Sequence, residues 1–119
     1  MYNANKGKLI EKVPAGTIVE GIIITIEDGK PREFIKTLEA QEKFKKLDEP
    51  AINLIIETKF DSRIFRVEQM FSYINGIDEV LYVEDSNLGK YVKQYSNLPK
   101  VSDKVKLIAN SKGFFKIIM

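Results

Sequence analysis

The residues best suited to chemistry in this sequence are basic and aromatic side chains that alternate in three stretches, around 30–36, 59–66 and 112–116. Single-stranded nucleic acid requires both kinds of side chain, because aromatic rings stack on bases and cationic groups contact phosphates. The candidate nucleic-acid-binding residues are Lys30, Arg32, Phe34, Lys36, Lys59, Phe60, Arg63, Arg66, Lys112, Phe114 and Lys116.

The arginines are the most selective part of this pattern. Arg32, Arg63 and Arg66 all belong to the candidate set, and every other basic residue is a lysine. Arginine pairs with phosphate through two parallel hydrogen bonds and also stacks on bases, whereas lysine acts as a hydrated point charge. The alternative is structural, since Arg66 faces Glu57 in the predicted hairpin and would form an ordinary surface ion pair there.

The phenylalanines also have a structural alternative, which is the hydrophobic core. We expect Phe65 and Phe71 in the core, together with one of Phe114 and Phe115. Adjacent residues of a strand point to opposite faces, so the other member of that pair is expected to face outward.

Charge is unevenly distributed, although the net charge is only +2. Residues 67–85 contain five carboxylates and no Lys or Arg, while residues 86–119 contain seven lysines and one aspartate. This distribution predicts a polarised surface whose basic face meets phosphates. The alternative is that the lysines serve only solubility.

The sequence contains no Cys and no His, which excludes disulfides, thiol nucleophiles, imidazole bases and the usual zinc sites. It also has no nucleophile elbow and no phosphate-binding glycine loop. We therefore expect no enzyme activity, no catalytic residue, no metal and no cofactor. The acidic residues around 78–85 lack metal-ligand spacing and are expected to form a solvated loop.

Strands dominate the elements that must position these residues. The β-branched residues of 17–27 predict a first strand, in which Gly21 marks a bend or bulge, with a turn at Asp28 and Gly29. The alternating runs 51–60 and 63–73 are two residues apart and predict an antiparallel hairpin.

Shorter elements follow from caps and breakers. Phe34 and Ile35 predict a short strand, and helical spacing behind Thr37 predicts a short helix that ends by Leu47. Residues 80–83 are strand-like. Ser86 caps a second helix, which must stop before Pro99. The last hairpin combines strands over 104–109 and 114–119.

Three segments of the last third, 86–91, 98–105 and 110–114, resemble the C-terminal half of compact oligonucleotide/oligosaccharide-binding (OB) proteins of the single-stranded-DNA-binding kind. The order of the elements agrees with this, because a helix between the third and fourth principal strands is the OB arrangement. We expect an all-β fold with one or two short helices, a five-stranded Greek-key OB barrel over 13–119, and a flexible leader over 1–12.

The resemblance implies that the ligand is single-stranded nucleic acid, DNA rather than RNA, held with little sequence preference across the second and third strands and the adjoining loops. OB barrels also bind proteins, so the alternative function is a protein-interaction or assembly module. No run of 18–20 apolar residues and no signal-peptide pattern occurs. We therefore expect a cytoplasmic protein with no membrane partner.

Overall fold

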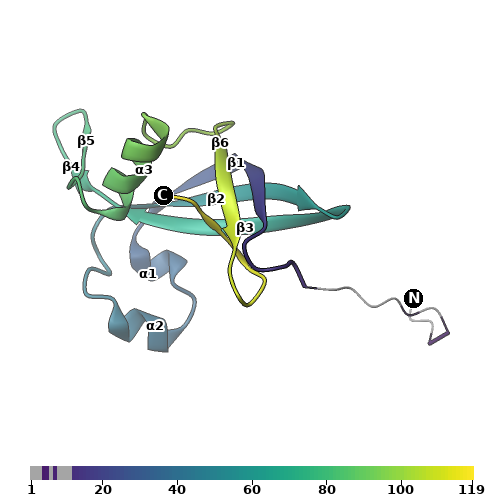
Figure 1. Cartoon of the computed structure of the whole chain (residues 1–119). Helices are drawn as coiled ribbons and strands as arrows, with labels where there is room; N and C mark the ends of the chain where they lie inside the picture. The colour runs from purple at the N-terminus through teal and green to yellow at the C-terminus, as the bar shows by residue number, and fades with distance from the viewer. Residues whose placement is uncertain (1–3, 6, 8–11) are drawn as a thin grey trace.

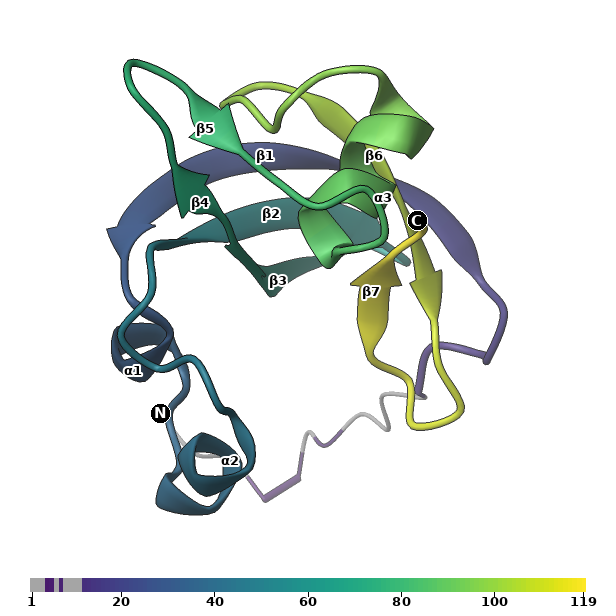
Figure 2. The ribbon, with the colours of Figure 1, turned by 90° about the vertical axis from the view of Figure 1, so that its left-hand side faces the viewer.

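A five-stranded antiparallel sheet dominates the structure, a computed structural model that describes residues 4–5, 7 and 12–119 (Figure 1). Its strands are β1 (Ile18–Gly29), β2 (Ala51–Phe60), β3 (Arg63–Ser72), β6 (Lys104–Ala109) and β7 (Phe115–Ile117). They are ordered β3-β2-β1-β6-β7, and the sheet curls until β3 and β7 approach each other (Figure 2). This is the Greek-key order of an OB barrel, nearly closed, and the predicted fold class is confirmed.

The remaining elements are three helices and a small hairpin. The helices are α1 (Pro31–Phe34), α2 (Leu38–Lys43) and α3 (Asn87–Tyr95), and the hairpin pairs β4 (Ile74–Asn75) with β5 (Val80–Leu81). The part of the chain that the structure describes thus has one helix more than predicted. Most of the predicted leader lies outside the described residues.

Strand β1 holds the barrel together because it pairs along both of its edges. Residues 18–22 pair with β6, and residues 21–29 pair with β2. The register with β2 shifts between Ile23 and Thr25, so the irregularity lies beyond Gly21 rather than at it. Gly21 instead leaves room for core side chains. A Cβ at this position would lie 2.7 Å from Cγ2 of Ile56 and 2.9 Å from Cδ1 of Leu107.

The long β2–β3 hairpin matches its prediction almost residue for residue. Asp61 and Ser62 form the turn, and both adopt positive φ values of 50° and 61°. Such a turn matches the twist of the paired strands. Because side chains alternate along β2, Leu54 and Ile56 are fully buried inside the barrel, while Lys59 points outward.

Helix α3 covers one opening of the barrel. The Ser86 hydroxyl accepts a hydrogen bond from the backbone N–H of Gly89, which confirms the predicted cap. The ring of Tyr91 is buried 5.6 Å from that of Phe71. The Tyr95 hydroxyl donates to the carbonyl of Ile118 and thereby connects the helix to the end of the chain.

The connection between β1 and β2 differs from its prediction. Asp28 and Gly29 continue β1 instead of forming a turn, and the predicted strand at Phe34 and Ile35 is wrong. Pro31 begins a helical turn there, since a proline at the first helical position loses no hydrogen bond, and the N–H of Ile35 bonds to its carbonyl. Thr37 caps α2 as predicted.

Candidate nucleic-acid interface

A groove between β3 and the β6–β7 turn brings several candidate residues together. It has a volume of about 320 Å³ and is called the β3–β7 groove below. It is lined by Phe65, Arg66, Val67, Glu68, Gly113, Phe114 and Phe115. Phe114 is the exposed aromatic here, with 68% of its surface accessible, whereas its neighbour Phe115 is buried. The adjacent pair thus divides between surface and core.

The β6–β7 turn fixes the position of Phe114. The side-chain oxygen of Asn110 accepts hydrogen bonds from the backbone N–H groups of Lys112 (2.9 Å) and Phe114 (3.0 Å). Gly113 adopts a φ of 83°, which a glycine tolerates without strain. Lys112 and Lys116 are exposed on either side of the aromatic ring. The turn therefore presents one ring between two cationic side chains.

Arg66 and Arg63 approach this region from β3. Arg66 is exposed, and its Nε lies 3.6 Å from a carboxylate oxygen of Glu57, the cross-strand pair that the sequence offered as the alternative. The Arg63 guanidinium lies 5.3 Å from the centre of the Phe65 ring. Its Nε is buried without a hydrogen-bond partner among the described residues. Arg63 also lines a second hollow, together with Lys12 and Phe60.

Phe60 does not offer a flat surface for stacking. It is half buried, and its ring meets the edge of Phe115 with centroids 6.5 Å apart. The Phe65 ring packs on Phe115 in the same way at 5.3 Å. The three rings form a partly buried cluster beneath the groove, so their main contribution is to the core. Lys59 remains exposed on the outer face of β2.

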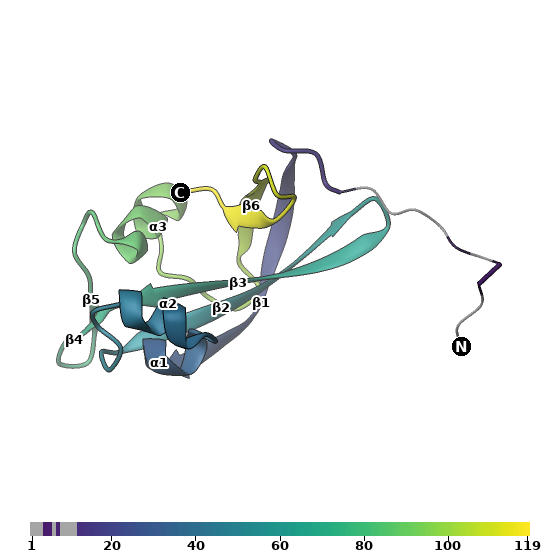
Figure 3. The ribbon, with the colours of Figure 1, turned by 90° about the horizontal axis from the view of Figure 1, so that it is seen from below.

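The candidates from the β1–β2 connection lie elsewhere. Helices α1 and α2 sit near the end of the β2–β3 hairpin that is remote from its turn (Figure 3). Ala51 marks that end and Phe60 the other, and a ten-residue strand spans roughly 30 Å. Lys30, Arg32, Phe34 and Lys36 are thus separated from the groove, so Arg32 does not lie with the other two arginines of the candidate set.

Arg32 also forms a hydrogen-bonded ion pair with a carboxylate. Its Nε and Nη2 atoms each donate to Asp48, both at 3.1 Å. This hydrogen-bonded pair lowers the pKa of Asp48 and raises that of Arg32. The Arg32 backbone N–H bonds to the carbonyl of Leu47. Arg32 therefore fastens α1 to the segment before β2.

The outer face of β2 and β3, where OB barrels usually hold ligands, and the adjoining face of β1 carry four glutamates beside the cations Lys59 and Arg66. Asn53 is buried in the sheet, and its amide donates to Glu27 (3.2 Å) and to Glu68 (3.0 Å). Glu20 and Glu57 lie on the same face by strand alternation. The sequence analysis missed this cluster. Cross-strand register between 27, 53 and 68 is the signal that identifies it, and register is known only once the strands are paired.

Comparison with known protein families, curated proteins and solved structures found no match. Within the described residues, no group of three or more acidic side chains is placed to bind a metal ion. None of the helices in that part of the chain has the length and apolar character needed to cross a bilayer.

Proposed function

We propose that this protein binds single-stranded nucleic acid along the β3–β7 groove, without catalysis and with little sequence preference. The observation that carries the proposal is Phe114, an aromatic ring exposed to 68% in a groove that also contains Arg66. Stacking of a base on such a ring is worth about 1–3 kcal/mol. Only an unpaired base can present its face to the ring, which favours a single strand over a duplex.

Cationic side chains supply the contacts with phosphates. Lys112 and Lys116 flank Phe114, while Arg66 and Arg63 approach from β3. Arg63 keeps most of its guanidinium donors available, because its contact with Phe65 is made through the ring face. The glutamates of the outer face repel phosphates, and of these Glu68 also lines the groove beside Arg66. The strand is therefore expected to follow the seam between β3 and β7 rather than cross β1 and β2.

The choice of DNA over RNA rests on the resemblance of the last third of the chain to single-stranded-DNA-binding OB proteins. A direct competition between an oligothymidylate and an oligouridylate of equal length tests it. Tighter binding of the oligouridylate would contradict the DNA assignment and leave the groove unaffected.

The test of the groove is a titration of fluorescently labelled oligothymidylate, followed by anisotropy at about 50 mM and about 200 mM salt. The variant Arg63→Ala/Arg66→Ala is expected to bind more weakly and to reduce the slope of log K against log salt by about 1.4, since about 0.7 counterion is released per phosphate contact on a single strand. Arg66→Ala alone, which removes an exposed side chain, covers the case in which loss of Arg63 impairs folding.

The matched control is Lys43→Ala/Lys46→Ala. It removes the same charge from residues 43–46, where the lysines pair with Glu39 and Glu49. We expect near wild-type binding. Equal loss in both double variants would mean that only overall charge matters, and absence of saturable binding by the wild type at about 50 mM salt would refute the proposal.

A further inference from the structure

The β4–β5 hairpin exposes a continuous apolar segment at the end of the barrel opposite the β2–β3 turn (Figure 1). Ile77 at its tip is 93% accessible, and Val83 is 57% accessible. Only two residue pairs, Ile74 with Leu81 and Asn75 with Val80, hold the two strands together. A two-stranded hairpin of this kind is marginal on its own in water. Apolar surface concentrated in this way typically marks a site of interaction.

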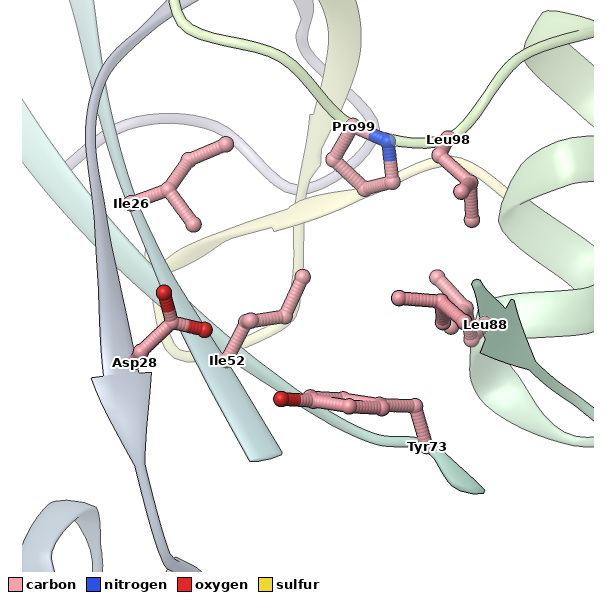
Figure 4. Close-up of a pocket in the computed structure, with 8 residues that line it drawn as sticks. Ile26, Asp28, Ile52, Tyr73, Leu88, Leu98 and Pro99 are labelled. Carbon is pink, nitrogen blue, oxygen red and sulfur yellow. The ribbon is translucent and has the colours of Figure 1, made fainter. Parts of the chain in front are cut away.

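An apolar pocket of about 160 Å³ opens beside this hairpin (Figure 4). Ile26 and Ile52 line it from the sheet, Leu98 and Pro99 from the segment after α3, and Val80 from the hairpin. Asp28 and Tyr73 bring polar atoms into the apolar wall. In Figure 4 the Asp28 carboxylate points into this space, and the Tyr73 ring extends toward Ile52 and Asp28 with its hydroxyl leading.

Asp28 is the one charged residue among those that line the pocket. Asp28 forms no ion pair with any described residue. Residues 67–85, which include the whole hairpin, contain no Lys or Arg. The lysine of the neighbouring hollow, Lys46, lies 3.9 Å from Glu49. The pocket therefore combines apolar walls with an unpaired carboxylate, and the hairpin beside it carries Asp78 and Glu79 and no cation.

We propose that the pocket and the β4–β5 hairpin bind an extended segment of a partner protein, with a lysine of the partner in the pocket and its apolar neighbours on the hairpin. A lysine has a long aliphatic stem and a terminal ammonium. The stem matches Ile26, Ile52 and Leu98, and the ammonium matches the Asp28 carboxylate and the Tyr73 hydroxyl. Nucleic acid does not fit here, because Asp28 and the carboxylates of the hairpin, Asp78 and Glu79, repel phosphates.

The hairpin also offers a backbone surface to the same segment. A two-stranded sheet has two outer edges, and an extended chain adds to such an edge through main-chain hydrogen bonds. Its alternate side chains then face the sheet, which places one of them over the pocket and the next along the apolar residues of the hairpin. This site is separate from the β3–β7 groove, so the protein can hold a strand of nucleic acid and a partner at once.

The test uses a synthetic dodecapeptide that alternates lysine with leucine and isoleucine, titrated into isotopically labelled protein and followed by NMR. We expect saturable shifts at Asp28, Tyr73 and the residues of the β4–β5 hairpin. Asp28→Asn, which changes one atom of the side chain, is expected to weaken binding about fivefold. A peptide with norleucine in place of lysine is expected to bind wild type and Asp28→Asn equally, since it lacks the ammonium.

The matched control is Asp61→Asn in the β2–β3 turn, which removes the same charge and accepts the positive φ of that residue. It is expected to bind the peptide as wild type does. Peptide shifts centred on Phe114, or equal weakening by both variants, would overturn the proposal. Shifts at the hairpin that appear when the protein alone is concentrated would assign the surface to a second copy instead, and shifts at the hairpin on titration with oligothymidylate in the absence of peptide would assign it to nucleic acid.

Discussion

The two ends of the β2–β3 hairpin both carry basic residues, but the side chains that surround these residues differ. Near α1 and α2, Arg32 is held by two hydrogen bonds to Asp48, and Lys43 and Lys46 lie near Glu39 and Glu49. Toward the β2–β3 turn, Arg63 contacts an aromatic ring instead of a carboxylate, and Arg66 has a single contact of 3.6 Å between its Nε and Glu57. Amino-acid composition does not distinguish these cations from one another as possible ligand contacts. The carboxylates that the fold brings to them decide which are available to a ligand.

The same contrast extends to the apolar surface. The β3–β7 groove presents an exposed aromatic ring beside Arg66 and Glu68, with Lys112 and Lys116 flanking that ring, whereas the opposite end of the barrel presents several aliphatic side chains and the Asp28 carboxylate. A phosphate-bearing ligand favours the first surface, and a basic polypeptide favours the second. The two proposals thus assign two kinds of recognition to opposite ends of the barrel, and changes that act at one end without affecting the other test that assignment.

The largest expected effect at a single residue is that of Phe114→Ala. We expect a loss of oligothymidylate affinity equivalent to about 1–3 kcal/mol, because a stacking surface disappears. The salt dependence should stay nearly unchanged, since no phosphate contact is removed. The side chain is exposed, so the free energy of unfolding should change by less than about 0.5 kcal/mol. Anisotropy titrations and urea denaturation measure the two quantities.

Leu38→Ala is the control for Phe114→Ala, because Leu38 on α2 is also an exposed apolar side chain, at 79%. It should bind oligothymidylate as wild type does. A comparable loss in both variants would show that exposed apolar area in general, rather than a defined stacking position, carries the interaction.

The second prediction concerns α3, the helix that covers one opening of the barrel. Burial, with a smaller contribution from Asp103, raises the pKa of Tyr91 to about 12 from 10.0. The folded protein therefore holds this proton to a higher pH than the unfolded chain does. Stability is unaffected below about pH 10 and falls by about 2 kcal/mol as the pH rises to about 12.

Chemical denaturation of wild type and Tyr91→Phe between pH 8 and about pH 12 measures this effect as a difference. The variant lacks the hydroxyl and should lose less stability over that range. Parallel pH profiles for the two proteins would mean that the Tyr91 phenol is accessible to water and that α3 does not seal the barrel.

The sequence alone predicted the strands and helices whose boundaries depend on neighbouring residues. Residues 51–60 alternate, Ser86 and Thr37 cap helices, and Pro99 stops one, so these boundaries were predicted. The sequence alone did not predict side-chain contacts between residues that lie far apart along the chain. The pairing of Arg32 with Asp48 and the cluster of Glu27, Asn53 and Glu68 depend on which residues the fold places together, and no spacing in the sequence contains that information.

The third prediction neutralises the carboxylate that pairs with an arginine, once at each end of the β2–β3 hairpin. Glu57→Gln removes the carboxylate beside Arg66 and should strengthen oligothymidylate binding about two- to threefold, because exposed ion pairs are worth less than about 1 kcal/mol. Asp48→Asn releases Arg32 in the same manner but should leave binding unchanged, since Arg32 is remote from the groove. Improved binding in Asp48→Asn would place the nucleic acid near α1 and break the comparison.

The smallest expected effect is on stability at low pH. The hydrogen-bonded Arg32 guanidinium lowers the pKa of Asp48 from its ordinary value of 3.8. The stabilisation that this pair provides is fully present above the unfolded-state pKa, and it is lost as the pH falls through the lower, folded-state value. Both side chains are exposed, so the change is small and decreases with added salt. Thermal melts of wild type and Arg32→Ala should differ at pH 6 and converge as the pH falls below the folded-state pKa of Asp48. Oligothymidylate binding at pH 6 should be equal for the two proteins, because this arginine holds the α1 segment in place and has no role in the groove. A difference in melting temperature that persists below the folded-state pKa of Asp48 would mean that Arg32 stabilises the fold through packing of its aliphatic stem rather than through Asp48.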